Sequence, residues 1–191
     1  MDYIEQYNRY KEQSLFGRYI TLQKIEPLLK KFKAEKIAVS VLDKPIYQYN
    51  IGNGKTKVFM WSQMHGNEST TTKALFDFFN FLNSNENLAT TFLETFTFCV
   101  LPMVNPDGAA AYTRANANNV DLNRDSVDLS QPESIVLRQT FDEFKPDFCF
   151  NLHDQRTIFG AGNTGNPATV SFLAPSYNEN RDVNDVRKKA M

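Results

Sequence analysis

Two histidines and one glutamate are the residues of this chain whose types and spacing could bind a metal ion. The chain has only two histidines, His65 and His153, and Glu68 follows the first of them by three residues. If the chain turns into a helix after His65, positions i and i+3 face the same way and can converge on one ion. Two imidazoles and one carboxylate, with a fourth position left for water, form the ligand set of a catalytic zinc site. The same residues also fit histidines that only form hydrogen bonds at strand ends, so the spacing alone leaves both interpretations open.

Both histidines are expected where a buried strand ends. His65 closes the almost continuously apolar run 57–64, and His153 closes the apolar run 147–153. Continuous apolar runs are typical of strands that are buried on both faces of a parallel sheet. In such sheets, ligands bind beyond the carboxyl ends of the strands. We therefore expect both imidazoles at the rim where α/β proteins form their sites.

The apolar pattern predicts helices that alternate with strands. Thr21 is a candidate N-cap for a short helix that ends in a run of lysines, and Pro132 opens a helix that ends near residue 144. A third helix is predicted over residues 70–82, with Ala74, Leu75, Phe78, Phe79 and Leu82 on its apolar face. The predicted strands are three runs within 37–65, separated by turns at 43–45 and 52–54, and then 95–104, 147–153 and 170–175.

This order of elements predicts an α/β protein. We expect a mixed, largely parallel central sheet with helices on both faces. Residues 1–36 are expected to form an N-terminal helical segment, and residues 37–191 the rest of the domain.

Composition excludes several classes of function. The chain has 191 residues, of which 41% are hydrophobic and 23% charged, and its net charge is −1. These values argue against disorder and give no sign of a nucleic-acid or membrane-surface partner. No signal peptide is visible, and no apolar stretch approaches the roughly 18 to 20 residues of a membrane span. Cys99 and Cys149 lie in apolar runs and are expected to be buried free thiols, so we expect a cytoplasmic protein.

A long polar stretch, residues 105–131, separates the two histidines. Pro106, Asp107 and Gly108 are expected to break regular structure at its start. A loop of this length inside a compact domain is usually functional or disordered.

Four segments of the chain resemble, in order, the motifs of a known family. HGNE begins at His65, NPDG at Asn105, VDLNR at Val120 and NLH at Asn151. Together they resemble the zinc metallocarboxypeptidases of the funnelin type, in particular their bacterial members, over roughly residues 40–174. The resemblance implies a carboxypeptidase-like fold. It also implies that His65, Glu68 and His153 bind one zinc ion.

The resemblance also suggests roles for four residues around the metal. Asp121 resembles the carboxylate that accepts the free ring N–H of the first zinc histidine, although it also fits an ordinary loop turn. Asn123 and Arg124 resemble the pair that holds the terminal carboxylate of the substrate. Arg114 resembles the arginine that polarises the scissile carbonyl and stabilises the oxyanion. As an alternative, Arg114 is a surface arginine on a loop.

The activity implied is zinc-dependent hydrolysis of a C-terminal peptide or amide bond by metal-activated water. The expected substrate is a peptide or an N-acyl amino acid with a free carboxylate. A small-molecule N-acyl amino acid deacylase or amidase would use the same residues and is the first alternative. The second is a non-catalytic protein that binds zinc and carboxylates without turnover.

The chain departs from the family pattern in two places. Asn119 stands where many members have glycine, which is tolerable because asparagine enters the left-handed region more readily than most residues. The family's general base is a glutamate on a later strand, and Glu133, Glu143 and Glu179 match no such motif. We therefore expect the domain to be truncated, with its base beyond residue 191 and the fragment alone nearly inactive.

The residues that follow the second histidine are polar. Asp154, Gln155 and Arg156 are expected either to face the pocket and bind substrate or to form hydrogen bonds within the loop. The sequence does not separate these two roles.

Overall fold

A computed structural model of the chain describes residues 3–154, 160, 162–166, 178–180 and 185. The chain divides into a unit Met1–Asp154 and a unit Gln155–Met191. The fold and the site below belong to the first unit. The predicted strand at 170–175 lies outside the described residues. The boundary between the predicted segments 1–36 and 37–191 stays a prediction.

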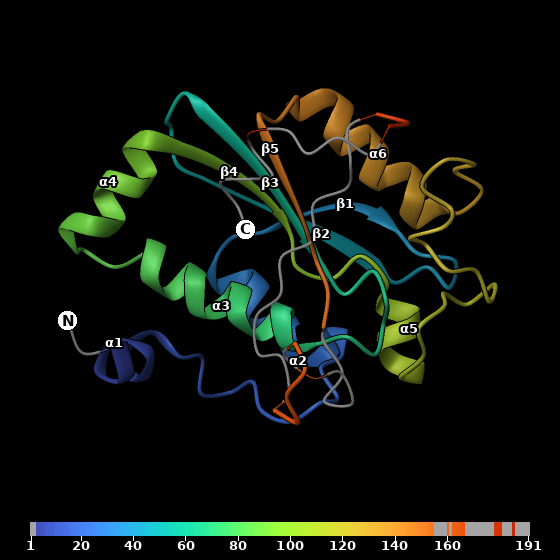
Figure 1. Cartoon of the computed structure of the whole chain (residues 1–191), viewed down its shortest axis with the longest axis horizontal. Helices are drawn as coiled ribbons and strands as arrows, with labels where there is room; N and C mark the ends of the chain where they lie inside the picture. The colour runs from blue at the N-terminus through green and yellow to red at the C-terminus, as the bar shows by residue number, and fades with distance from the viewer. Residues whose placement is uncertain (1–2, 155–159, 161, 167–177, 181–184, 186–191) are drawn as a thin grey trace. The chain divides into compact units, whose positions relative to one another are not determined.

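A five-stranded mixed sheet forms the centre of the first unit (Figure 1). Its strands are β1 (Glu35–Val39), β2 (Pro45–Ile51), β3 (Thr56–Ser62), β4 (Phe96–Leu101) and β5 (Phe148–Leu152), in the order β1-β2-β4-β3-β5. β3 runs parallel to β4 and β5, whereas β2 is antiparallel to β1 and β4. This arrangement confirms the predicted mixed α/β class, with the parallel pairs around β3.

Helices cover both faces of this sheet. They are α1 (Tyr3–Tyr10), α2 (Leu22–Lys31), α3 (Thr70–Leu82), α4 (Asn87–Thr95), α5 (Pro106–Ala111) and α6 (Pro132–Phe144). Figure 1 shows α6 on one side of the sheet and α2 and α3 on the other. The pattern did not predict α1 and α4, because α1 buries no residue and α4 buries only Ala89. No helix within the described residues is long and apolar enough to cross a membrane.

Alternating side chains of the central strands divide the core in two. Val58 and Phe98 pack with α2 and α3, whereas their neighbours Phe59 and Cys99 pack with Val136 of α6. Successive side chains of a strand point to opposite faces, so a strand buried on both faces needs an unbroken apolar run. The apolar runs of β3 and β4 are therefore explained by the helices on both sides.

Helix α5 corrects the prediction that regular structure breaks at residues 106–108. Pro106 occupies the first turn of this helix, and the side chain of Asn105 accepts a hydrogen bond of 2.7 Å from the backbone N–H of Gly108. Proline is favoured at a first helical position because its missing N–H would have no partner there. The segment thus begins with a capped helical turn.

Helix α3 has its predicted ends, but its buried face is rotated from the predicted one. Phe76 is fully buried, whereas Ala74 is exposed. Phe79 is buried as predicted and forms aromatic contacts with Phe76, Phe32 and Tyr49. Packing against α2 and β2 therefore buries the face of α3 that carries Phe76 and not the face that carries Ala74.

The two cysteines differ in exposure, which corrects the prediction that both are buried. Cys99 is buried in β4, and burial raises its pKa to about 12, whereas Cys149 is exposed on β5. Within the described sheet β5 pairs only with β3, so one edge of this strand has no strand neighbour.

We expect iodoacetamide at pH 8 to alkylate Cys149 and to spare Cys99, because the thiolate is the reactive form and a solvent path is needed. Partial burial raises the pKa of Cys149 as well, so its labelling is expected to speed up as the pH rises. Mass spectrometry of the digested protein identifies the labelled cysteine. The Cys149→Ser variant should take up no label while folded. Equal labelling of Cys99 in the folded protein would contradict the placement of β4.

Candidate metal centre

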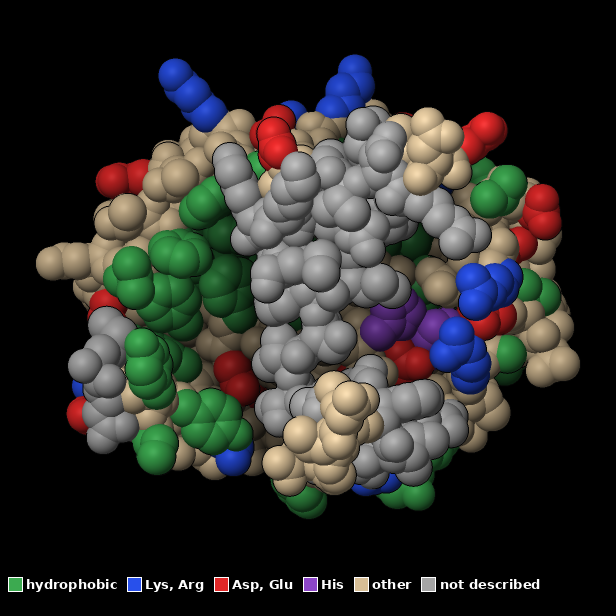
Figure 2. Space-filling model, in the orientation of Figure 1, with side chains coloured by type: hydrophobic (Ala, Val, Ile, Leu, Met, Phe, Trp, Pro, Cys, Tyr) green, Lys and Arg blue, Asp and Glu red, His purple; other side chains and the backbone are tan. Residues whose placement is uncertain are grey.

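The parallel pairing of β3 and β5 brings both histidines to one rim of the sheet. Ser62 of β3 is paired with Leu152 of β5, and both strands end there. His153 follows directly, and His65 follows after a short turn. The centres of the two imidazole rings are 4.8 Å apart. Figure 2 shows histidine side chains beside acidic and basic side chains on the viewed face.

A buried glutamine fixes the turn that carries His65. Gln63 has a left-handed backbone (φ 49°), and its Nε2 donates hydrogen bonds of 2.8 Å to the carbonyls of Ile20 and Gly66. The hydroxyl of Thr72 in α3 donates to its Oε1 at 2.8 Å. Because this amide has a partner on each side, the turn is held to both the N-terminal segment and α3. His65 is only 1% exposed as a result.

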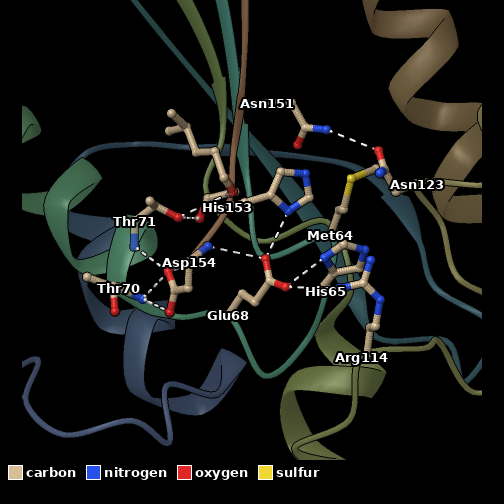
Figure 3. A network of polar contacts seen from close by, with 12 residues as sticks. Met64, His65, Glu68, Thr70, Thr71, Arg114, Asn123, Asn151, His153 and Asp154 are labelled. Carbon is tan, nitrogen blue, oxygen red and sulfur yellow. Dashed lines mark hydrogen bonds and ion pairs between the residues drawn. The ribbon is translucent and has the colours of Figure 1, made fainter. Parts of the chain in front are cut away.

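Glu68 lies between the two imidazole rings (Figure 3). Its Oε1 is 2.9 Å from Nδ1 of His65, and its Oε2 is 2.9 Å from Nδ1 of His153. One ligand atom from each of the three residues lies within 4.8 Å of the others. The structure thus brings together the three residues predicted to bind the metal.

Asp121 and Arg114 lie next to this cluster. Oδ1 of Asp121 is 3.0 Å from Nε2 of His65, so this imidazole lies between two carboxylates. Arg114 donates from Nε to Oδ2 of Asp121 at 3.0 Å and from Nη1 to Oε1 of Glu68 at 3.2 Å. The guanidinium therefore bridges the two carboxylates that hold His65.

These contacts keep both carboxylates ionised. Burial alone would raise the pKa of Glu68, but hydrogen bonds from His153 and His65 outweigh it and hold this pKa well below its usual range. At Asp121, burial likewise raises the pKa, but hydrogen bonds from His65 and Arg114 lower it below its usual value. Both side chains therefore keep a negative charge at neutral pH, as ligation of a cation requires.

Asn123 and Arg124 lie on the loop just after Asp121. The backbone N–H of Asn123 donates to Oδ1 of Asp121 at 2.9 Å, and its side-chain oxygen accepts from Asn151 at 3.3 Å. Arg124 is exposed, and its side chain has no hydrogen bond or ion pair with other residues that the structure describes. Asn119 has φ 59°, so the predicted use of the left-handed region is confirmed.

Comparison with known proteins identifies the family. The profile of the family described as zinc carboxypeptidase matches residues 21–164. The chain belongs to this family.

Relatives in the zinc carboxypeptidase family share the fold and part of the sequence. Carboxypeptidase 2 of Trichophyton rubrum is 30% identical over 118 residues, which are 62% of this chain and 21% of that protein. The metallo-carboxypeptidase of Burkholderia cenocepacia has a TM-score of 0.63 and 20% identity, with 69% of this chain and 40% of that chain covered. A metallo-carboxypeptidase from Pseudomonas aeruginosa, in complex with (2-guanidinoethylmercapto)succinic acid, has a TM-score of 0.59 and 21% identity, with 69% of this chain and 39% of that chain covered. The chain spans about a fifth of the length of the curated relatives that it matches first.

The donor set at the rim fits the zinc ion that gives this family its name. Two imidazole nitrogens and one carboxylate oxygen are a common catalytic zinc set. In this structure Nε2 of His65 faces Asp121, which leaves Nδ1 on the side of Glu68 and His153. A carboxylate that accepts the remote ring N–H is the usual support of a zinc histidine. The residues present therefore fit the metal.

The structure shows the hydrogen bonds of two acidic residues, Asp154 and Glu133, whose contacts the sequence did not predict. Asp154 does not serve as a free polar group of the pocket, because its carboxylate accepts hydrogen bonds from the backbone of Thr70 and Thr71 at the start of α3. Gln155 and Arg156 lie outside the described residues. Glu133 is fully buried and accepts a hydrogen bond from the backbone of Val41, away from the metal cluster.

Proposed function

We propose that this chain carries the zinc and carboxylate sites of a metallocarboxypeptidase that removes the last residue of a peptide. The observation that carries this proposal is the convergence of His65, Glu68 and His153 within 4.8 Å, beside Asp121 and Arg114. Hydrolysis breaks the last C–N bond, with the hydroxyl of water joining the carbonyl carbon and a proton joining the released amine.

In this proposal His65, Glu68 and His153 would hold one zinc ion. Both histidines would offer Nδ1, the nitrogen that faces Glu68, while Nε2 of His65 stays hydrogen bonded to Asp121. When bound, zinc lowers the pKa of water and polarises a carbonyl. Arg114, next to Glu68 and Asp121, would place a fixed positive charge where negative charge develops on the carbonyl oxygen.

Asn123 and Arg124 would bind the terminal carboxylate of the substrate. A guanidinium is a planar fork of donors that matches a carboxylate, and Arg124 is exposed to solvent. Asn151 donates to the side-chain oxygen of Asn123, so the amide N–H groups of Asn123 stay available for a ligand. The succinic acid derivative in the Pseudomonas aeruginosa structure supports a site for carboxylates.

We further propose that the general base comes from beyond Met191. Each carboxylate in the described cluster is already engaged in hydrogen bonds that hold the site together. Glu68 and Asp121 accept from the histidines and Arg114, and Asp154 accepts from the backbone of α3. The 191-residue chain is therefore expected to bind zinc and carboxylates with little turnover, because general acid/base catalysis contributes about 10² to 10⁴ in rate.

The test compares the 191-residue chain with a protein that continues beyond residue 191. Elemental analysis should find one zinc per chain in both, and a chelator should remove it. The longer protein should release the last residue of a peptide with a free carboxylate, and it should lose this activity on chelation and regain it with zinc. Cleavage of N-acyl amino acids without cleavage of peptides would favour the deacylase. Zinc binding without hydrolysis of either substrate would favour the non-catalytic protein.

Arg124→Ala is expected to weaken binding of a peptide with a free C-terminal carboxylate to the zinc-loaded chain by about 10- to 100-fold. A hydrogen bond to a charged group contributes about 1.5 to 3 kcal/mol, and 1.4 kcal/mol is tenfold in affinity. Isothermal titration gives the dissociation constants. Arg138→Ala is the matched control, since Arg138 is an exposed arginine paired with Asp142 on α6. Equal affinities of Arg124→Ala and the unmodified chain would refute the assigned role.

A further inference from the structure

The first turn of α3 is capped by a residue that follows strand β5. Ser69 is the N-cap residue of α3 but makes no side-chain cap, and its hydroxyl donates to the carbonyl of Arg18 at 2.7 Å. The carboxylate of Asp154 accepts from the N–H of Thr70 at 3.0 Å and from the N–H of Thr71 at 3.3 Å. A carboxylate at a helix N-terminus satisfies orphan N–H groups and suits the helix dipole. The segment just after β5 thus supplies the cap that Ser69 does not provide.

The same residue contacts a predicted metal ligand directly. The backbone N–H of Asp154 donates to Oε2 of Glu68 at 3.2 Å, the oxygen that also faces Nδ1 of His153 (Figure 3). On the other side of His153, the carbonyl of Leu152 accepts from the hydroxyl of Thr71 at 3.4 Å. Both neighbours of His153 are therefore joined to the first turn of α3, which begins two residues after Glu68.

We infer that Asp154 is a positioning residue that fixes His153 and Glu68 relative to each other for metal binding. His65 and Glu68 lie three residues apart on one turn, so their spacing is set locally. His153 directly follows β5 and lies 85 positions after Glu68 in the sequence, and β5 has a neighbour on one side only in the described sheet. The cap ties the end of this strand to α3. This inference rests on the proposed zinc site.

Replacing Asp154 should weaken zinc binding although all three ligand residues remain in the chain. Partners that orient metal ligands typically contribute 10- to 100-fold in metal affinity. We therefore expect Asp154→Ala to raise the zinc dissociation constant by about 10- to 100-fold, measured by competition with a chromophoric chelator. Asp154→Asn should restore most of the affinity, since asparagine caps helices about as well as aspartate. The visible spectrum of the cobalt-loaded protein should change in Asp154→Ala and return in Asp154→Asn.

Asn83→Ala is the matched control for loss of helix stability. Asn83 ends α3, and its side chain donates to Phe79 and Tyr49, far along the helix from the metal cluster. This variant should lose stability in urea but keep its zinc affinity and cobalt spectrum. The inference fails if Asp154→Ala binds zinc like the unmodified chain. It also fails if Asn83→Ala weakens zinc binding equally for an equal loss of stability. If the unmodified chain binds no zinc, the proposed zinc site itself fails.

Hydrogen exchange tests the same coupling without a variant. If the cap favours zinc binding, zinc binding must favour the cap by the same factor. Zinc should therefore slow exchange of the amides of Thr70, Thr71 and Asp154, while the amides at the start of α2 serve as an internal reference. Unchanged exchange at Thr70 and Thr71 on zinc loading would overturn the inference, even if Asp154→Ala does not fold.

Discussion

His153→Ala is expected to lower zinc affinity by about 100-fold or more with little loss of fold stability. Zinc sites in proteins bind with roughly 10 kcal/mol or more, so one of three protein ligands accounts for about 3 kcal/mol. The side chain of His153 is 34% exposed and that of His65 only 1%. Removing His153 therefore leaves the core intact, and a change in zinc affinity can be assigned to the lost ligand.

Zinc content after dialysis and the dissociation constant by chelator competition measure this effect, with the unfolding midpoint recorded in parallel. Glu68→Gln should lose affinity as well, because a neutral amide replaces the charged ligand. Glu133→Gln is its matched control, since Glu133 is a buried glutamate bonded to Val41 and Asn116 away from the cluster. Full zinc affinity in His153→Ala, or a loss in Glu133→Gln equal to that in Glu68→Gln, would contradict the ligand set.

The sequence predicted the helices and strands that are marked by a local pattern, such as an apolar run or a proline at a helix start. The apolar runs of β3 and β5 end at the two histidines, and Pro132 begins α6 as expected. Helices that bury few or no residues were not predicted: α1 buries none and α4 buries only Ala89. The exposure of Cys149 could not be predicted, because an apolar run does not tell whether a strand lies inside a sheet or at its edge.

The candidate site was predictable as a set of residues but not as a set of contacts. The spacing of His65 and Glu68 encodes one local contact, and the ends of the two apolar runs predicted that His153 lies at the same rim. The resemblance supplied the other members of the site. The bridge from Arg114 to Glu68 and the cap from Asp154 to Thr70 join residues that are 46 and 84 positions apart. Such contacts depend on how the chain folds back, which no local pattern records. An aspartate next to a ligand signals only that a polar group is present.

Gly66→Ala is expected to destabilise the protein by about 3 kcal/mol and to weaken zinc binding. A Cβ at Gly66 would lie 1.9 Å from the carbonyl carbon of Gly108 and 2.2 Å from the backbone nitrogen of Ala109. Both atoms belong to the backbone of α5, so no flexible side chain can move aside. Overpacking typically costs 1 to 3 kcal/mol, and a rigid backbone places this variant at the upper end. The turn from His65 to Glu68 must then shift away from α5.

Urea unfolding gives the change in stability, and chelator competition gives the change in zinc affinity. Gly165→Ala is the matched control, because a Cβ there meets nothing within 4 Å and Gly165 is not among the glycines with positive φ. It should unfold at the same urea concentration as the unmodified chain. The two effects of Gly66→Ala have one cause, since the turn that holds two of the three proposed ligands is pressed against α5. A Gly66→Ala protein as stable as Gly165→Ala would therefore disprove the close approach of this turn to α5.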